Sequence, residues 1–297
     1  MKWGICGAGF VSQDFCTALR LLNHEDHQIT AVAARDIDRA WKFANEYKIP
    51  KAFGCYEDLA KEPTVDVVYI GVINTEHCRL SLMMLNNNKH VLCEKPATMN
   101  LMQLQKVINT AKEKKLFFLG GLWSRFFPAY EKIRSALNSK TLGEVRYVEA
   151  EFGRPIIHSP RLHKPELGVD KCASIILIYK GGRMTNLMYH TEIQAKNNAV
   201  IYGTKGLIEV PCPFWAATKV KINGDEMEFP LPTKDAKFNF INTAGFSYEA
   251  ECVRTCIENG QLECPLFPHS EAITMMTIMD EVRRQLGVKY DVDDIEP

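Results

Sequence analysis

The stretch KWGICGAGFVSQDFCTALRLL, Lys2 to Leu22, joins two patterns that decide the fold of the first half of the chain. It begins with a short apolar run, which predicts a buried strand, and continues with apolar residues at helical spacing. The two patterns meet at Gly7-Ala8-Gly9, where the chain must turn sharply from strand to helix. A strand, a glycine turn and a helix in this order predict the first unit of a strand–helix alternation.

The glycine turn is suited to binding a pyrophosphate. One glycine permits the tight turn, and the next lets backbone N–H groups approach the phosphates at the N-terminus of the helix. Ser12 stands where the G-x-G-x-x-G fingerprint has its third glycine, and it is small enough for the helix to pack closely on the strand. The residues assigned to a dinucleotide at this turn are Gly7, Gly9, Phe10 and Val11.

Strand-like and helical segments continue to alternate through residues 1–122. The segments His27–Asp36, Val65–Val72 and Lys89–Pro96 are apolar and β-branched, as strands buried on both faces are. Amphipathic segments separate them. This order predicts an α/β fold in which residues 1–122 form a nucleotide-binding domain with a Rossmann-type, doubly wound parallel sheet.

The pattern changes after one further helix. Longer alternating strands follow one another from Gly143 onward, and Asn223-Gly224 marks a hairpin turn. Two helical segments, Ser247–Gly260 and Ser270–Gly287, close the chain. We therefore expect residues 123–297 to form a second, α+β domain with an open, mostly antiparallel sheet that carries substrate and dimer contacts.

Composition argues against several kinds of partner. Lys+Arg and Asp+Glu both total 36 in 297 residues, so bulk charge attracts neither nucleic acid nor an anionic membrane. The apolar run at the N-terminus is interrupted too early for a signal peptide, and no segment reaches transmembrane length. The expected location is the cytosol.

The ten cysteines are scattered, without a C-x-x-C pair. Cys252 and Cys256 share a helical face, but the sequence offers no matching His or Cys pair to complete a zinc site. We therefore expect single buried thiols and no metal.

The second strand ends in Arg35-Asp36, where the cofactor ribose is normally bound. An acid there would bind the 2′-hydroxyl of NAD, whereas an arginine suits the 2′-phosphate of NADP. Because Arg35 comes first, directly after AVAA, the sequence favours NADP. The alternative is that Asp36 caps the next helix and Arg35 is merely solvated.

The stretch KHVLCEKPA, Lys89 to Ala97, is an apolar strand that ends abruptly in Glu94-Lys95-Pro96. Polar residues and proline end many strands without any further role. Ligands of parallel sheets, however, bind beyond the carboxyl ends of the strands. A lysine at the end of a buried strand also needs a partner, so we expect the charge of Lys95 to meet a ligand.

Four features stand in order along the chain, GAGFVS, AARD, INTEH and EKP, and together they resemble the family of glucose–fructose oxidoreductases and inositol dehydrogenases. Longer matches, among them DHQITAVAARD, IPKAFGCYEDLAKEP and AGFSYEAECVR, narrow the resemblance to NADP-dependent dehydrogenases of trans-dihydrodiols and D-xylose. The resemblance implies a homodimer and a small-molecule substrate. Another sugar or cyclitol dehydrogenase of the same family remains an alternative.

The resemblance also implies roles for individual residues. Lys95 would be catalytic beside the nicotinamide and the reacting hydroxyl, with Glu94 and a cis Pro96 setting its direction. The remaining residues that it places at the cofactor are Tyr69, Asn74, His77, Trp123 and Arg125, the last two lining the cleft between the domains. His77 has an alternative reading as a helix cap or a solvated side chain.

An apolar substrate pocket is implied by matching aromatic positions in the second half. Its residues are Trp123, Phe152, Trp215 and Phe240. For Trp215 and Phe240 the alternative is a structural position in the core.

One motif of the family is missing. Its members carry Asp-x-Gly-x-His or Asp-x-Gly-x-Tyr in the second domain, where the His or Tyr is the general acid/base, but this chain passes from Gly168 to Val169 without it. The resemblance implies that a block with one helix and one strand is absent, which would shorten the second domain and expose new sheet edges. Substitutes within reach in sequence are His158, His163 and Tyr179. The alternative function is therefore a shortened, catalytically weak NADP-binding protein.

Overall fold

The computed structural model describes residues 1–156, 169–233 and 235–294. Their contacts divide the chain into two compact units. The first unit contains residues 1–126, 232–281 and 290–297, and the second contains residues 127–231 and 282–289. The expected domains were continuous, 1–122 and 123–297, whereas these units group residues 232–281 with the N-terminal part.

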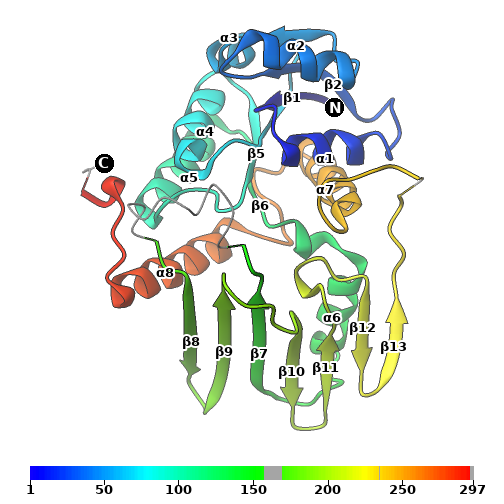
Figure 1. Cartoon of the computed structure of the whole chain (residues 1–297), viewed down its shortest axis with the longest axis vertical. Coiled ribbons are helices and arrows are strands. Elements are labelled where there is room, and N and C mark those ends of the chain that lie inside the picture. The colour runs from blue at the N-terminus through cyan, green and yellow to red at the C-terminus, as the bar shows by residue number, and fades with distance from the viewer. Residues whose placement is uncertain (157–168, 234, 295–297) are drawn as a thin grey trace. The chain divides into compact units, whose positions relative to one another are not determined.

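The first unit is built on a six-stranded parallel sheet (Figure 1). The strand order is β3-β2-β1-β4-β5-β6. From β1 the chain first adds β2 and β3 on one side, and it then adds β4, β5 and β6 on the other side of β1. The strands are β1 (Lys2–Cys6), β2 (Gln28–Ala33), β3 (Lys51–Phe53), β4 (Val67–Ile70), β5 (His90–Glu94) and β6 (Phe118–Gly121). This order confirms the doubly wound parallel sheet, and its topological switch point lies between β1 and β4.

Helices pack on this sheet and bury its apolar strands. The helices of the first unit are α1 (Phe10–Leu19), α2 (Ile37–Glu46), α3 (Tyr56–Lys61), α4 (His77–Asn86), α5 (Leu101–Lys114), α7 (Phe246–Glu258) and most of α8 (His269–Leu286), with the short 3₁₀ turns η1 (Asn74–Glu76), η2 (Trp123–Phe126), η5 (Thr243–Gly245) and η6 (Asp291–Asp294). Helix α4 lies beside α5, and α1 lies beside α7 (Figure 1). All four residues of β4 are fully buried, which explains its unbroken apolar sequence.

Close packing at the switch point requires a residue without a side chain at the end of β4. A Cβ added to Gly71 would lie 2.4 Å from the Oγ of Ser12 and 2.8 Å from the ring of Tyr69. Ser12 itself is fully buried on α1. The close packing of α1 on the sheet therefore depends on Gly71, which follows β4, as well as on the small size of Ser12.

Helix α7 is attached to the N-terminal strands and to α1 by buried polar side chains. The indole N–H of Trp3 donates to Nδ1 of His27 (3.1 Å), and Nε2 of His27 lies 2.9 Å from Glu251 on α7. Because Nδ1 accepts, the proton of the neutral ring is on Nε2 and is donated to Glu251. Asp14 on α1 is also buried, and it accepts from the hydroxyl of Thr243 (2.6 Å), just before α7.

The second unit contains a seven-stranded sheet in the order β13-β12-β11-β10-β7-β9-β8 (Figure 1). Only the pair β7 and β9 is parallel, which confirms the expected mostly antiparallel sheet. The strands are β7 (Val145–Gly153), β8 (Cys172–Tyr179), β9 (Arg183–His190), β10 (Ala199–Gly203), β11 (Gly206–Val210), β12 (Lys219–Ile222) and β13 (Asp225–Glu228). A 3₁₀ turn, η4 (Phe214–Ala216), precedes β12.

The core of the second unit forms between α6 (Pro128–Asn138) and one side of this sheet. Ala129 and Ile133 of α6 are buried with Ile208 and Val220 of the strands. The strand at the sheet edge, β8, leaves large apolar side chains exposed, and Ile178 retains 80% of its accessible surface. Among the described residues, apolar side chains are therefore exposed along this edge strand.

Candidate active site

The N-terminus of α1 is open toward the carboxyl ends of the strands. Gly7 has a φ of +107°, and its amide donates to the carbonyl of Ala33 (2.9 Å). A Cβ at Gly7 would lie 2.8 Å from Val72 and 3.0 Å from the carbonyl oxygen of Gly71, so only glycine fits this turn. Gly9 is the N-cap residue, and no side chain caps the helix. The backbone N–H groups and dipole of the first turn are therefore available to a pyrophosphate.

The other predicted residues of this turn, Phe10 and Val11, form the first turn of α1. Phe10 is 61% exposed and Val11 is half-buried against the core. The turn residues thus fit a dinucleotide, because a phosphate can approach the backbone without meeting a buried side chain.

Arg35 and Asp36 follow β2 on the same edge of the sheet. Oδ1 of Asp36 accepts from the backbone N–H of Arg39 (2.9 Å), so Asp36 caps α2 as the alternative reading proposed. Arg35 is exposed. The cap uses one carboxylate oxygen of Asp36 and leaves the guanidinium of Arg35 facing solvent beyond the strand.

Glu94, the last residue of β5, has a buried carboxyl group. Its Oε1 accepts from the hydroxyl of Tyr69 (2.9 Å), and its Oε2 lies 3.3 Å from the backbone N–H of Lys95. Tyr69 is fully buried, with its ring stacked on Phe15 at 3.8 Å between centroids. Burial raises the pKa of Glu94, against the opposing effects of the Lys95 charge and these hydrogen bonds.

A second buried acid, Glu249 on α7, lies close to the first. Its side chain is fully buried, and neither carboxyl oxygen has a hydrogen-bond partner among the described residues. A Cβ on Gly121, at the end of β6, would lie 3.6 Å from its Oε1. Burial raises the pKa of Glu249 well above its usual value, and the charge of Glu94 raises it further. The protonated form of Glu249 is therefore favoured well above the pH at which an ordinary carboxyl group ionises.

Glu249 was not predicted as a site residue, although the sequence contains a signal for it. On α7 the buried residues Phe246, Ala250 and Val253 recur at helical spacing, and Glu249 falls within the same buried face. An acid on the apolar face of a helix requires a partner or a raised pKa.

Lys95 follows Glu94 directly and is exposed. The Lys95–Pro96 peptide bond is cis, as expected. His77 at the start of α4 supports this turn, with Nδ1 at 2.7 Å from the carbonyl of Pro96 and Nε2 at 3.1 Å from the carbonyl of Val72. Burial lowers the pKa of His77, so the ring is neutral and donates to one of the two carbonyls. The alternative of a solvated His77 is wrong, because the side chain is buried.

The remaining predicted cofactor residues have different surroundings. Asn74 is exposed in η1. Trp123 is partly buried against Phe246, with 4.9 Å between ring centroids. Nε of Arg125 donates to the carbonyl of Leu266 (2.8 Å), and its guanidinium also pairs with Glu271. Arg125 is thus bound to the segment that precedes α8.

The residues predicted to line the substrate pocket belong to both units. Phe152 and Trp215, both in the second unit, meet edge to face at 4.8 Å, and the guanidinium of Arg154 lies 6.0 Å from the Trp215 ring. Phe240 belongs to the first unit, where its amide donates to Asp14 (2.9 Å) and half of its surface is exposed. Trp215 is partly buried and Phe240 is half exposed, so neither side chain is fully buried in a core.

Of the proposed substitutes for the acid/base, only Tyr179 is described. It ends β8, and 46% of its surface is exposed. His158 and His163, and the junction at Gly168, lie outside the described residues.

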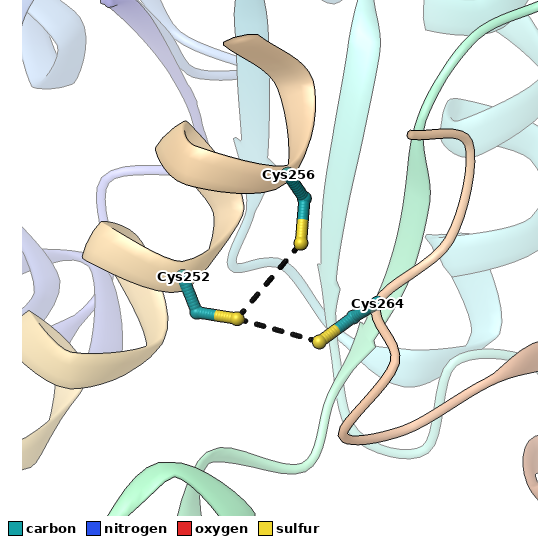
Figure 2. A group of neighbouring side chains, drawn as sticks. All are labelled: Cys252, Cys256 and Cys264. Carbon is teal, nitrogen blue, oxygen red and sulfur yellow. Dashed lines mark hydrogen bonds between the residues drawn. The ribbon is translucent and has the colours of Figure 1, made fainter. Parts of the chain in front are cut away.

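A cluster of three thiols also lies in the first unit (Figure 2). Cys264 approaches Cys252 and Cys256 of α7, for which the sequence indicated no matching His or Cys pair that would complete a zinc site. Local spacing could not show this contact, because a turn of the chain brings Cys264 back to the helix.

A glycine turn at the switch point of a parallel sheet, with a lysine after β5 at the same carboxyl edge, is the arrangement expected of an NAD(P)-binding oxidoreductase. A family model described as "Oxidoreductase family, NAD-binding Rossmann fold" matches residues 1–121. The trans-1,2-dihydrobenzene-1,2-diol dehydrogenase of Xenopus tropicalis is 40% identical over 326 residues, covering 97% of this chain and 99% of that protein. The enzyme of the same name from Homo sapiens is 37% identical over 330 residues, covering 99% of both chains. The chain therefore belongs to the oxidoreductase family with an NAD-binding Rossmann fold, and it is an enzyme.

Solved structures show the same fold at low sequence identity. The 3-ketoreductase KijD10 from Actinomadura kijaniata, in complex with NADP and TDP-benzene, has a TM-score of 0.77 at 18% identity, covering 96% of this chain and 97% of that chain. An NAD binding oxidoreductase from Klebsiella pneumoniae has a TM-score of 0.80 at 16% identity, covering 98% and 99%. Within the described part of this chain, no helix combines the length and apolar character that crossing a bilayer requires.

The raised pKa of Glu249 gives a pH-dependent contribution to stability. Above the ordinary pKa of 4.5 the folded chain keeps this proton and the unfolded chain loses it, so the free energy of unfolding falls as pH rises. Glu249→Gln removes the effect. Relative to the native chain, the variant should therefore gain stability as pH rises above about 5, by up to about 1.4 kcal/mol per pH unit until the folded-state pKa of Glu249 is reached. Urea unfolding across this range measures the difference.

Glu258→Gln is the matched control, since Glu258 is exposed on the same helix. Its difference from the native chain should stay level over the same pH range. Parallel pH curves for the native chain and Glu249→Gln would show that Glu249 ionises normally in the folded state.

Proposed function

We propose that this chain oxidises trans-dihydrodiols, such as trans-1,2-dihydrobenzene-1,2-diol to catechol, with NADP as the hydride acceptor. The observation that carries the proposal is the 37–41% identity, over nearly the whole chain, to dehydrogenases named for this substrate. D-xylose, which would be oxidised to its lactone, is the second substrate that we assign to the same site.

The chemistry rests on the end of β5. Oxidation of an alcohol transfers hydride from carbon to the nicotinamide, which the cofactor supplies when bound, and the hydroxyl proton must leave at the same time. The ammonium group of Lys95 would stabilise the developing alkoxide. The Tyr69–Glu94 hydrogen bond and His77, which contacts the carbonyl of Pro96, hold the backbone on both sides of Lys95. Tyr69 thus supports the cofactor site through Glu94.

We assign the remaining cofactor contacts to residues around the same edge of the sheet. Gly7, Gly9, Phe10 and Val11 would surround the pyrophosphate, Arg35 the 2′-phosphate, and Asn74, Trp123 and Arg125 the nicotinamide half. Phe152, Trp215, Phe240 and Trp123 would shape an apolar substrate pocket. We retain the expected domain roles, nucleotide binding by residues 1–122 and substrate and dimer contacts by residues 123–297, and a cytosolic location.

A second candidate function is supported by the missing acid/base motif. The relatives align over 326 to 331 residues, more than the 297 of this chain, so they contain residues without a counterpart here. Proton transfer typically contributes about 10²–10⁴-fold to such reactions. Without a replacement, the chain would bind NADP but oxidise the diol slowly.

The decisive experiment measures binding and turnover on one purified sample. NADPH fluorescence titration reports the cofactor site, and NADPH formation from trans-1,2-dihydrobenzene-1,2-diol reports chemistry. Lys95→Met should reduce turnover at least about 10²-fold, because the charge beside the reacting hydroxyl is lost. Lys106→Met, an exposed lysine on α5, is the control. Tight NADPH binding with no turnover by the native chain would favour the second candidate, and equal turnover of both variants would remove Lys95 from the mechanism.

The preference for NADP over NAD depends on Arg35. Arg35→Ala should weaken NADP binding by about 1.5–3 kcal/mol, or about ten- to a hundredfold in Kd, because a charge-assisted contact to the 2′-phosphate is lost. NAD binding should change little. Calorimetric titration of both cofactors, with exposed Lys42→Ala on α2 as the control, separates the outcomes. Equal weakening of NAD and NADP would contradict the assignment.

We propose that the second-unit sheet also mediates a homodimer. Ile176 and Ile178 of β8 are 60% and 80% exposed, and Met184, paired with Ile178 across the strands, is 41% exposed. Such a patch is typical of a protein interface. Ile178→Lys should shift sedimentation from dimer to monomer, whereas Met279→Lys on α8 should not. A native chain that sediments as a monomer would refute the proposal.

A further inference from the structure

The three thiols of Figure 2 come from two neighbouring segments of the first unit. Cys252 and Cys256 lie one turn apart on α7, and Cys264 lies in the segment between α7 and α8. The Sγ of Cys252 is 3.3 Å from that of Cys264 and 4.0 Å from that of Cys256. All three sulfur atoms lie within 4.8 Å of one another.

These distances are those of ligands around a single cation. A zinc–sulfur bond is about 2.3 Å, so two sulfurs of a tetrahedral site are about 3.8 Å apart. The observed separations lie on both sides of this value. A disulfide between Cys252 and Cys264 would leave Cys256 without a role, whereas a metal ion would use all three thiols.

The surroundings of Cys264 favour its thiolate. Its pKa is lowered chiefly because the thiols of Cys252 and Cys256 donate to it, and the backbone N–H groups of Leu266 and Phe267 lower it further. Arg125 contributes through the backbone, since its Nε donates to the carbonyl of Leu266 (2.8 Å). That carbonyl belongs to the same peptide unit as the N–H of Phe267, which donates to the backbone carbonyl of Cys264 (3.0 Å), so Arg125 helps to hold the turn that carries Cys264.

The other two thiols are not stabilised as anions in this way. Hydrogen bonds with Cys256 and Cys264 raise the pKa of Cys252. For Cys256 the hydrogen bond with Cys252 lowers the pKa, but the hydrogen bond with Cys264 and burial raise it overall. Cys256 and Cys264 are buried, and Cys252 is only partly so. Three thiolates can coexist here only if a cation compensates their charge, and each thiol would release its proton to water when the cation binds.

We propose that Cys252, Cys256 and Cys264 form a three-thiolate site for one Zn²⁺ ion. Thiolates select soft cations, chiefly Zn²⁺ and Cu⁺. A divalent ion leaves one net negative charge on the buried cluster, whereas Cu⁺ leaves two. The fourth zinc position would be filled by water, which can reach the cluster at the partly exposed Cys252. The ion would join α7 to the segment before α8, separately from the glycine turn and Lys95.

The test uses the full chain, reduced and then freed of metal by a chelator. Cobalt(II) is the spectroscopic probe, because thiolate-to-cobalt charge transfer absorbs in the near ultraviolet. One equivalent should give these bands, and one equivalent of Zn²⁺ should remove them and raise the melting temperature. Cys252→Ser and Cys264→Ser should weaken Co²⁺ binding at least about tenfold, by the loss of one thiolate ligand.

Cys212→Ser is the matched control, since Cys212 is exposed and outside the cluster. Circular dichroism checks the fold, and if buried Cys264→Ser does not fold, Cys252→Ser at the partly exposed position decides the result. Absent bands, or bands equally strong in Cys252→Ser, would overturn the proposal. A one-to-one Cu⁺ complex that Zn²⁺ cannot displace would overturn the choice of Zn²⁺. A Cys252–Cys264 disulfide found by mass spectrometry, without cobalt binding after reduction, would assign the cluster to redox chemistry instead.

Discussion

The hydrogen bond from Tyr69 to Glu94 is the contact on which the candidate site most depends. It joins the buried end of β5 to the fully buried ring of Tyr69 in β4. The other oxygen of the same carboxyl group faces the backbone N–H of Lys95. These partners offset part of the cost of burying the carboxyl group of Glu94. Together they direct the chain out of the sheet and present Lys95 at its carboxyl edge.

Helix α7 extends this arrangement, although it lies far along the chain. It brings the buried acid Glu249 close enough to Glu94 for the charge of Glu94 to raise its pKa, so the two carboxyl groups share one buried region. The same helix carries Glu251, which contacts His27, and two of the three clustered thiols. One C-terminal helix thus supports the nucleotide sheet and also bears a separate cluster of thiols. This explains why its residues pack in the same compact unit as β1 to β6.

Much of the fold could be predicted from local pattern. Apolar β-branched runs gave the buried strands of the parallel sheet, and amphipathic segments gave its helices, because each periodicity reflects which faces are covered. The glycine turn was placed correctly for the same reason, since only Gly7 permits the φ of +107° at that point. The position of Lys95 after a buried strand was also readable from the sequence.

By itself, the sequence determined the parallel sheet, the phosphate-binding turn and the lysine at the end of β5. Only the tertiary structure decided which distant side chains meet: Glu249 with Glu94, Thr243 with Asp14, and Cys264 with Cys252. It also showed that His77 is buried between two carbonyls and that Asp36 caps α2. The physical reason is the distance along the chain over which each signal acts. Periodicity records whether a residue is covered, whereas the identity of the covering group depends on how helices from remote parts of the chain pack on the sheet.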